Sequence, residues 1–144
     1  MTTRLSEDEL AAYFALRGAG DRLQREVSRQ LRSYGLTEVQ FSILASLSGA
    51  PQGMGMTELA GALVVTKSGL SYQAGQLEGK GLVLRSAAAG DERVVRLALT
   101  EAGRELISRV LPEHVQLVRR LFIDRLDAAD LATVRSSLAK VARD

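Results

Sequence analysis

Two short helical patterns, separated by only two or three residues, constrain this 144-residue chain more than any other feature of its sequence. The first runs from Thr57 to Leu63 and the second from Thr66 to about Gly79. Helices joined by so short a link pack across each other, which is the geometry of a helix-turn-helix motif. The pattern therefore predicts a compact helical unit in the middle of the chain.

The second of these helices has two different faces when its residues are placed at intervals of about 100°. Leu70, Ala74 and Leu77 fall together and predict a buried face. The opposite face is polar and uncharged, whereas a solvated helix usually carries Glu and Lys pairs there. Its residues are Ser68, Tyr72, Gly75, Gln76 and Gly79. Such a face suits close contact with hydrogen-bonding groups, such as base edges in a DNA major groove.

Strand-like alternation replaces the helical repeat after Gly79. Residues 82–85 and 94–99 predict two strands, joined by the segment 86–93. That connection is longer than a two-residue turn, so we expect a hairpin with a long tip. Arg93 lies near the end of this tip, beside Asp91.

Capping residues predict helices on both sides of this central region. Ser6 with Glu9, and Thr37 with Gln40, form capping boxes ahead of apolar periodic segments. These predict helices over 6–33 and 37–47, with a loop over 49–55. After the hairpin, Thr100 begins a helical segment expected to reach about residue 126, kinked or briefly broken at Pro112, and Asp127 caps a last helix.

Composition excludes several classes of protein. The chain has no cysteine and one histidine, so disulfides, thiolate metal sites and a cysteine nucleophile are excluded. It also lacks the His-Glu-x-x-His zinc motif and a phosphate-binding loop, so we expect neither an enzyme nor a bound metal or cofactor. An acidic start and the lack of a long apolar run predict no signal peptide and no membrane span, hence a cytoplasmic protein.

Net charge is only +2, too small by itself to indicate a nucleic-acid-binding protein. Residues 1–63 carry −1, residues 64–100 carry +2 and residues 101–144 carry +1. Binding to a duplex would therefore depend on where the five basic side chains of 64–100 lie.

Three stretches of the sequence carry a resemblance to a known family. They are Leu36 to Leu44, Leu77 to Arg85, and Asp91-Glu92-Arg93 followed by Leu97 to Gly103. In this order and at this spacing they resemble the MarR family of winged-helix transcriptional regulators, over nearly the whole chain. The third stretch is the most specific, because it matches the family's Asp-x-Arg wing and its Leu-Thr-x-x-Gly exit.

The resemblance implies a mainly α fold with a small β-hairpin wing, in a single domain over 1–144. Residues 36–100 would form the winged helix-turn-helix part, and residues 6–33 and 101–143 a helical dimerisation region from both termini. A globule of this size has a radius of gyration of roughly 15 Å. A two-fold pair would set equivalent helices about 30 to 40 Å apart, close to the roughly 34 Å between successive major grooves. A homodimer on a pseudo-palindromic operator is therefore expected.

The same resemblance places the helix over 66–79 in the major groove of double-stranded DNA. Phosphate contacts are then expected from Lys67, Ser68 and Ser71, and base or backbone contacts from Tyr72, Gln73 and Gln76. Arg93 would enter the flanking minor groove, oriented by Asp91. The blander alternatives are a surface ion pair for Asp91 and Arg93 and a partly buried ring for Tyr72.

Departures from the family pattern limit what the resemblance transfers. Members often carry arginine at the position of Tyr72 and an Asp-Arg pair at those of Gly75 and Gln76, so their operator sequences do not carry over. Neutral side chains there could equally face a protein, and the alternative function is a protein-interaction module that binds no DNA.

Members of the family usually respond to a small aromatic or lipophilic effector, and a repressor relieved by such a ligand is implied. No motif in this sequence identifies the effector. The polar or aromatic residues in suitable helices are Tyr13, Arg17, Tyr34 and His114, and a structural role is expected for each.

Overall fold

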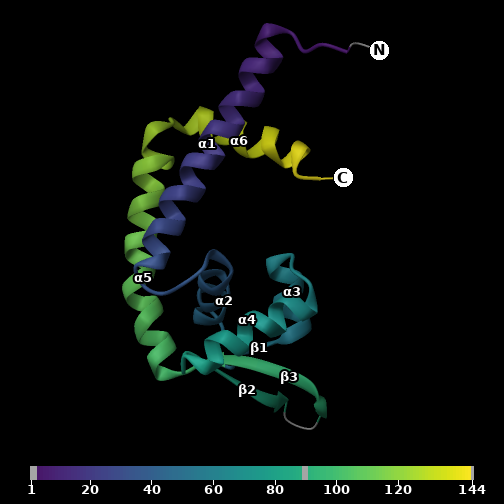
Figure 1. The fold of residues 1–144 in the computed structure, drawn as a ribbon, viewed down its shortest axis with the longest axis vertical. Coiled ribbons are helices and arrows are strands. Elements are labelled where there is room, and N and C mark those ends of the chain that lie inside the picture. Colours follow the sequence, from purple (N-terminus) through teal and green to yellow (C-terminus); the bar gives the residue numbers. More distant parts are fainter. Residues whose placement is uncertain (1–2, 89–90, 144) are drawn as a thin grey trace. The chain divides into compact units, whose positions relative to one another are not determined.

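The structure is a computed structural model that describes residues 3–88 and 91–143, and no side chain of residues 88–94 is described. The chain is mainly helical with one small antiparallel sheet, which confirms the predicted fold class (Figure 1). Within the described residues, no helix is long and apolar enough to cross a membrane. In chain order the elements are α1 (Glu7–Arg32), α2 (Glu38–Ser48), β1 (Met54–Gly55), α3 (Met56–Leu63), α4 (Lys67–Gly79), β2 (Val83–Ala88), β3 (Asp91–Leu99), α5 (Glu101–Leu121), the 3-10 helix η1 (Ile123–Arg125) and α6 (Ala128–Val141).

The chain divides into two compact units. The terminal unit contains the residues up to Val27 and those from His114 onward, and the winged unit runs from Ser28 to Glu113. The boundaries fall inside α1 and α5, and the winged unit contains the whole segment 36–100. The assignment of the remaining helices to dimerisation stays a prediction.

The winged unit has a continuous apolar core because α2, α3 and α4 each turn one face inward. Fully buried side chains come from all three helices: Ile43, Leu44, Leu59, Leu70 and Leu77. Their burial follows the helical period of the sequence, and it supplies the main stabilisation of the unit.

Local capping explains where the helices begin. Thr37 Oγ1 accepts a hydrogen bond from the Gln40 amide at 3.1 Å, and the Thr37 amide donates to Gln40 Oε1 at 3.2 Å. Ser6 and Glu9 exchange the same pair of bonds at 3.1 and 2.8 Å. Asp127 caps α6 through a bond from a first-turn amide at 2.8 Å. All three predicted caps are confirmed.

The segment 49–55, predicted as a loop, contributes a short strand to the sheet. The strand order is β1-β3-β2, and Met54 pairs with Leu97 in antiparallel register. Gly53 permits this approach, because it has a φ of 80° and a Cβ there would lie 2.6 Å from the Leu97 carbonyl oxygen. Arg96 also fixes the segment by donating to the Gly53 carbonyl oxygen at 2.8 Å.

The hairpin strands are longer than predicted. β2 continues to Ala88 and β3 begins at Asp91, so most of the expected tip over 86–93 belongs to the strands. Small residues with weak strand propensity occupy the end of β2, but Ser86 pairs with Arg96 and Ala87 with Val95. Pairing with β3 therefore overrides the local preference.

The long helix α5 runs without a break through Pro112, so the predicted break is wrong. A proline removes one backbone donor, and the helix continues where the turns around it are packed. Val110 and Leu117, on either side of the proline, are both buried. The helix ends at Leu121 rather than near residue 126, and the separate helix η1 follows it.

Candidate nucleic-acid interface

One face of α4 is exposed along its length, as the sequence predicts. Ser68, Gly75, Gln76 and Gly79 are exposed, and Tyr72 keeps 64% of its surface open to solvent. The ring of Tyr72 thus lies outside the core of the unit. A protruding, uncharged polar surface of this kind can form hydrogen bonds with base edges.

The first turn of α4 presents a cation and hydroxyl groups. Thr66 caps the helix by accepting a hydrogen bond from the Gly69 amide at 3.0 Å, and its hydroxyl lies 3.4 Å from that of Ser68. Lys67 is exposed, and this turn contains no acidic residue. Because the helix dipole is positive at this end, the turn favours anions such as phosphate groups.

Gln73 is less exposed than Tyr72 and Gln76 on the outer face of α4. It is half-buried, and its Oε1 accepts a hydrogen bond from Nε2 of Gln40 at 3.1 Å. Gln40 is itself buried and belongs to the cap of α2, so this bond ties α4 to α2. A contact from Gln73 to DNA stays a prediction, and its side-chain oxygen already has a partner.

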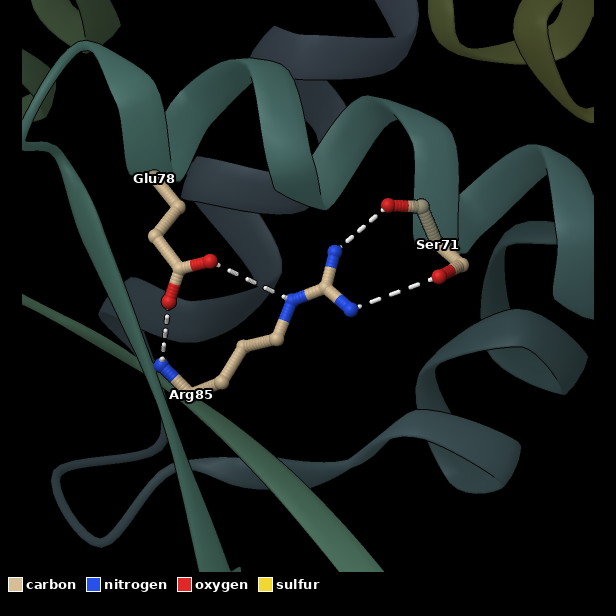
Figure 2. A network of polar contacts seen from close by, with 3 residues as sticks. All are labelled: Ser71, Glu78 and Arg85. Carbon is tan, nitrogen blue, oxygen red and sulfur yellow. Dashed lines mark hydrogen bonds and ion pairs between the residues drawn. The ribbon is translucent and has the colours of Figure 1, made fainter.

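Ser71 bonds to Arg85, which the sequence analysis did not select. Figure 2 shows the Arg85 side chain lying along α4 between Ser71 and Glu78. Nη1 of Arg85 donates to Ser71 Oγ at 3.3 Å, and Nη2 donates to the Ser71 carbonyl oxygen at 2.6 Å. Nε lies 3.6 Å from Oε1 of Glu78, and the Arg85 amide donates to Oε2 of Glu78 at 3.3 Å. One arginine thus joins the wing to two separate turns of α4.

The alternation of inward and outward residues along β2 could have indicated that Arg85 has an internal partner. Val83 is buried, Leu84 is exposed and Arg85 is half-buried, so Val83 and Arg85 share the inner face of the strand. A basic side chain on an inward face requires polar partners. Gly75 lies beside this side chain, since a Cβ there would be in ordinary van der Waals contact with Nη2 of Arg85 at 3.5 Å.

The five basic side chains of 64–100 divide between internal contacts and the surface. Lys80 and Arg96 donate to backbone carbonyl oxygens of the winged unit, at 2.6 and 2.8 Å. The side chain of Arg93 lies outside the described residues. Lys67 and Arg85 thus supply positive charge beside the first turns of α4.

These two cations line one groove of about 340 Å³, which we call the basic groove. It lies at the starts of α3 and α4 and against the hairpin, entirely within the winged unit. Among the residues whose side chains the structure describes, none that lines the groove carries a carboxylate. The lining residues are Gly55, Met56, Thr57, Lys67, Ser71, Arg85 and Val95. A groove of this charge suits a phosphate group.

Asp91 and Arg93 belong to β3 by their backbone, and Asp91 pairs with Ala88. Both were expected in a loop, so that placement is corrected to a strand. Their side chains lie outside the described residues, and both the surface ion pair and the contact with the minor groove stay predictions.

The four residues considered for an effector, Tyr13, Arg17, Tyr34 and His114, all have interactions within the chain. Arg17 donates to the Tyr13 hydroxyl at 3.1 Å, with its guanidinium carbon 5.9 Å from the ring centre. The Tyr34 hydroxyl donates to the Glu113 carboxylate. No group of three His, Asp or Glu side chains in the described part of the chain could hold a metal ion.

The hydrogen bond from Tyr34 to Glu113 predicts that the Tyr34 phenol loses its proton at a higher pH than a free tyrosine does. The carboxylate accepts from the neutral phenol and, together with desolvation and the repulsion between negative charges, raises the pKa of Tyr34 above 10.0. Its stabilisation is therefore present below about pH 10 and is lost as pH rises through the folded-state pKa. We expect Tyr34→Phe to remove an absorbance step above pH 10 from the phenolate titration, and Tyr72→Phe to keep it. A step lost at lower pH would contradict this bond.

Comparison with known proteins agrees with this geometry. Residues 36–95 match the model of the MarR family. The HTH-type transcriptional regulator PecS of Dickeya dadantii is 34% identical over 96 residues, which are 65% of this chain and 58% of PecS. The structure of AbsC, a MarR family transcriptional regulator from Streptomyces coelicolor, is 34% identical, with a TM-score of 0.91 over 98% of this chain and 96% of AbsC. The chain belongs to the MarR family.

A second MarR family structure was solved in complex with DNA. Sco3205 from Streptomyces coelicolor, in complex with DNA, is 30% identical, with a TM-score of 0.90 over 99% of this chain and 90% of that one. The winged unit of the present MarR family chain contains the matched residues 36–95. These relatives are named transcriptional regulators.

Proposed function

We propose that this chain binds double-stranded DNA in a sequence-specific manner, as a homodimer on a pseudo-palindromic operator. The observation that supports this is the exposed, uncharged face of α4 beside the basic groove. In this arrangement α4 enters the major groove, where Tyr72 and Gln76 meet base edges while Lys67 and Ser68 meet phosphates. The DNA complex of the related Sco3205 supports the assignment.

Other residues of the interface are proposed to orient or extend it. Arg93, oriented by Asp91, enters the flanking minor groove, where a narrow groove concentrates negative potential. Ser71 contributes through its hydroxyl, which also accepts from Arg85. Gln73 contributes through its amide nitrogen, because its oxygen is bonded to Gln40.

We further propose a cytoplasmic repressor, relieved by a small aromatic or lipophilic effector. MdtR of Bacillus subtilis, named a transcriptional repressor, is 27% identical over 141 residues, which are 95% of this chain and 90% of MdtR. The terminal helices, over 6–33 and 101–143, are proposed as the dimer interface. The effector would act by changing the separation of the two α4 helices, and so their fit to successive grooves.

Selection of bound fragments from genomic DNA by the purified protein tests this function. Repeated selection should enrich fragments that share a two-fold sequence, and their affinity should fall steeply with salt concentration because bound counterions are released. A protein-interaction module would instead enrich no common sequence. Binding that is absent, or indifferent to salt, would favour that alternative.

Gln76→Ala is expected to change which fragments are bound more than how tightly they are bound. A side chain that reads a base contributes roughly 1–3 kcal/mol of discrimination at one position of the site. Comparing the enriched sequences with those of the wild type measures this change. The matched control is Gln52→Ala, which removes an exposed glutamine outside α4. An equal loss of affinity for every fragment would place Gln76 on the phosphates instead.

A further inference from the structure

Arg85 is fixed in the basic groove, and its contacts with the described residues use only part of its hydrogen-bonding capacity. A guanidinium carries five N–H donors, two on each terminal nitrogen. Each terminal nitrogen makes one described bond to Ser71, and Nε forms the ion pair with Glu78 (Figure 2). One N–H of each terminal nitrogen is left over from these contacts. The side chain is 30% exposed, so these donors are not sealed in the core.

Lys67 brings a second cation to the same groove from a different element. It is exposed at the first residue of α4, whereas Arg85 comes from β2, and both line the cavity of about 340 Å³. Glu78 pairs with Arg85 at Nε and does not line the groove, and no described lining side chain carries a carboxylate. An anion in the groove would therefore be attracted by both cations. The groove therefore matches a phosphate group rather than an apolar or cationic ligand.

We propose that the basic groove holds one backbone phosphate of duplex DNA, bound jointly by Arg85 and Lys67, in each half of the operator. The inference rests on the proposed DNA-binding function and deepens it. The groove adjoins the exposed face of α4, and the phosphates of a duplex border the groove into which such a helix inserts. Because the same guanidinium bonds the Ser71 carbonyl oxygen in the middle of α4, this phosphate also sets the position of the helix.

Duplexes with one neutral methylphosphonate linkage in each half-site test the contact between the two cations and a phosphate directly. They are made from a selected fragment, with the neutral linkage moved one position at a time in both half-sites. At one position, the neutral linkage should weaken wild-type binding about tenfold. At that linkage, neither Arg85→Gln nor Lys67→Gln should lose further affinity, because the interaction is already absent. Sensitivity that persists undiminished in Arg85→Gln, or two different linkages for the two variants, would overturn the proposal.

The salt dependence of DNA affinity separates the effect of the charge of Arg85 from the effect of its hydrogen bonds. Weakening one phosphate contact in each half-site should reduce the slope of log affinity against log salt by up to about 1.8 for Arg85→Gln. Arg85→Lys should keep the slope, because it keeps the charge, while it loses the two-point bond to Ser71. Arg96→Gln is the matched control, since Arg96 lies on the adjacent strand outside the groove, and it should retain the sensitive linkage. An unchanged slope in Arg85→Gln, with the melting temperature intact, would also overturn the proposal.

A third measurement distinguishes DNA phosphate from a free phosphate ligand. At matched ionic strength, inorganic phosphate should inhibit wild-type binding no better than chloride does. Inhibition specific to phosphate, and absent from Arg85→Gln, would assign the groove to a free phosphate-bearing molecule and overturn the proposal. If the wild type binds no duplex, the proposed function itself fails and this inference fails with it, whereas the outcomes above overturn the inference alone.

Discussion

Gly103→Ala is expected to destabilise the chain by about 3 kcal/mol or more. Gly103 lies in the first turn of α5, where an added Cβ would overlap the carbonyl oxygen of Leu82 and lie 3.0 Å from its carbonyl carbon. Both atoms are backbone, so no side-chain rotation can relieve the overlap. The start of α5 would have to move away from the hairpin, which would strain the bond from the Thr100 amide to the Leu82 carbonyl oxygen at 3.1 Å.

A second helical glycine provides the control for this substitution. Gly61 lies inside α3, and an added Cβ there would meet no atom within 4 Å. Gly61→Ala should therefore raise the free energy of unfolding by about 0.5–1 kcal/mol through helix propensity alone. Urea unfolding followed by circular dichroism measures both variants. Equal unfolding midpoints for the two would show that α5 can shift at Gly103 without cost.

The same contacts give a physical reason for the Leu-Thr-x-x-Gly stretch that ends the wing. Thr100 Oγ1 accepts from the Gly103 amide at 3.0 Å and donates to the Gly81 carbonyl oxygen at 2.7 Å. The threonine thus caps α5 and joins it to the turn before β2, and the glycine allows the close approach. The resemblance located this motif in the sequence, whereas its mechanical role required the position of Leu82.

Features that depend on neighbours in sequence could be predicted from the chain alone. Thr37 and Gln40 are three residues apart, and their reciprocal bonds followed from the capping pattern. The buried face of α4 followed from helical period in the same way, since Leu70, Ala74 and Leu77 need only the geometry of one helix. Each of these features is complete within a few turns of backbone.

Features that depend on distant partners could not be predicted in this way. β1 forms because Gly53 permits close approach to Leu97 of β3, which is distant in the sequence. The candidate interface was incomplete for a similar reason, because Arg85 acquires its position from Ser71 and Glu78 on another element. Local propensity contains no information about such a partner. The inward position of Arg85, on the same face of β2 as Val83, indicates only that a polar partner is needed.

Leu138→Glu is expected to turn the proposed dimer into monomers and to weaken operator binding about a hundredfold or more. Among the described residues, the terminal unit contributes only Leu117 and Leu121 to the buried hydrophobic side chains, and α6 contains none. Its helices instead line an open apolar cavity of about 580 Å³, with Leu23 from α1 and Leu138 from α6. In the proposed dimer, a second copy would cover this apolar surface.

The design separates loss of the interface from loss of the fold. Leu138 is already 40% exposed in the single chain and glutamate favours helix, so the monomer should keep its helical content. In a dimer the same carboxylate would be buried without a partner, which is strongly unfavourable. Val39→Glu, the same kind of change on α2 of the winged unit, should leave the oligomeric state unaltered. Sedimentation of Leu138→Glu as a dimer at wild-type concentrations would place the interface elsewhere, because no symmetric contact through this cavity could tolerate two added charges.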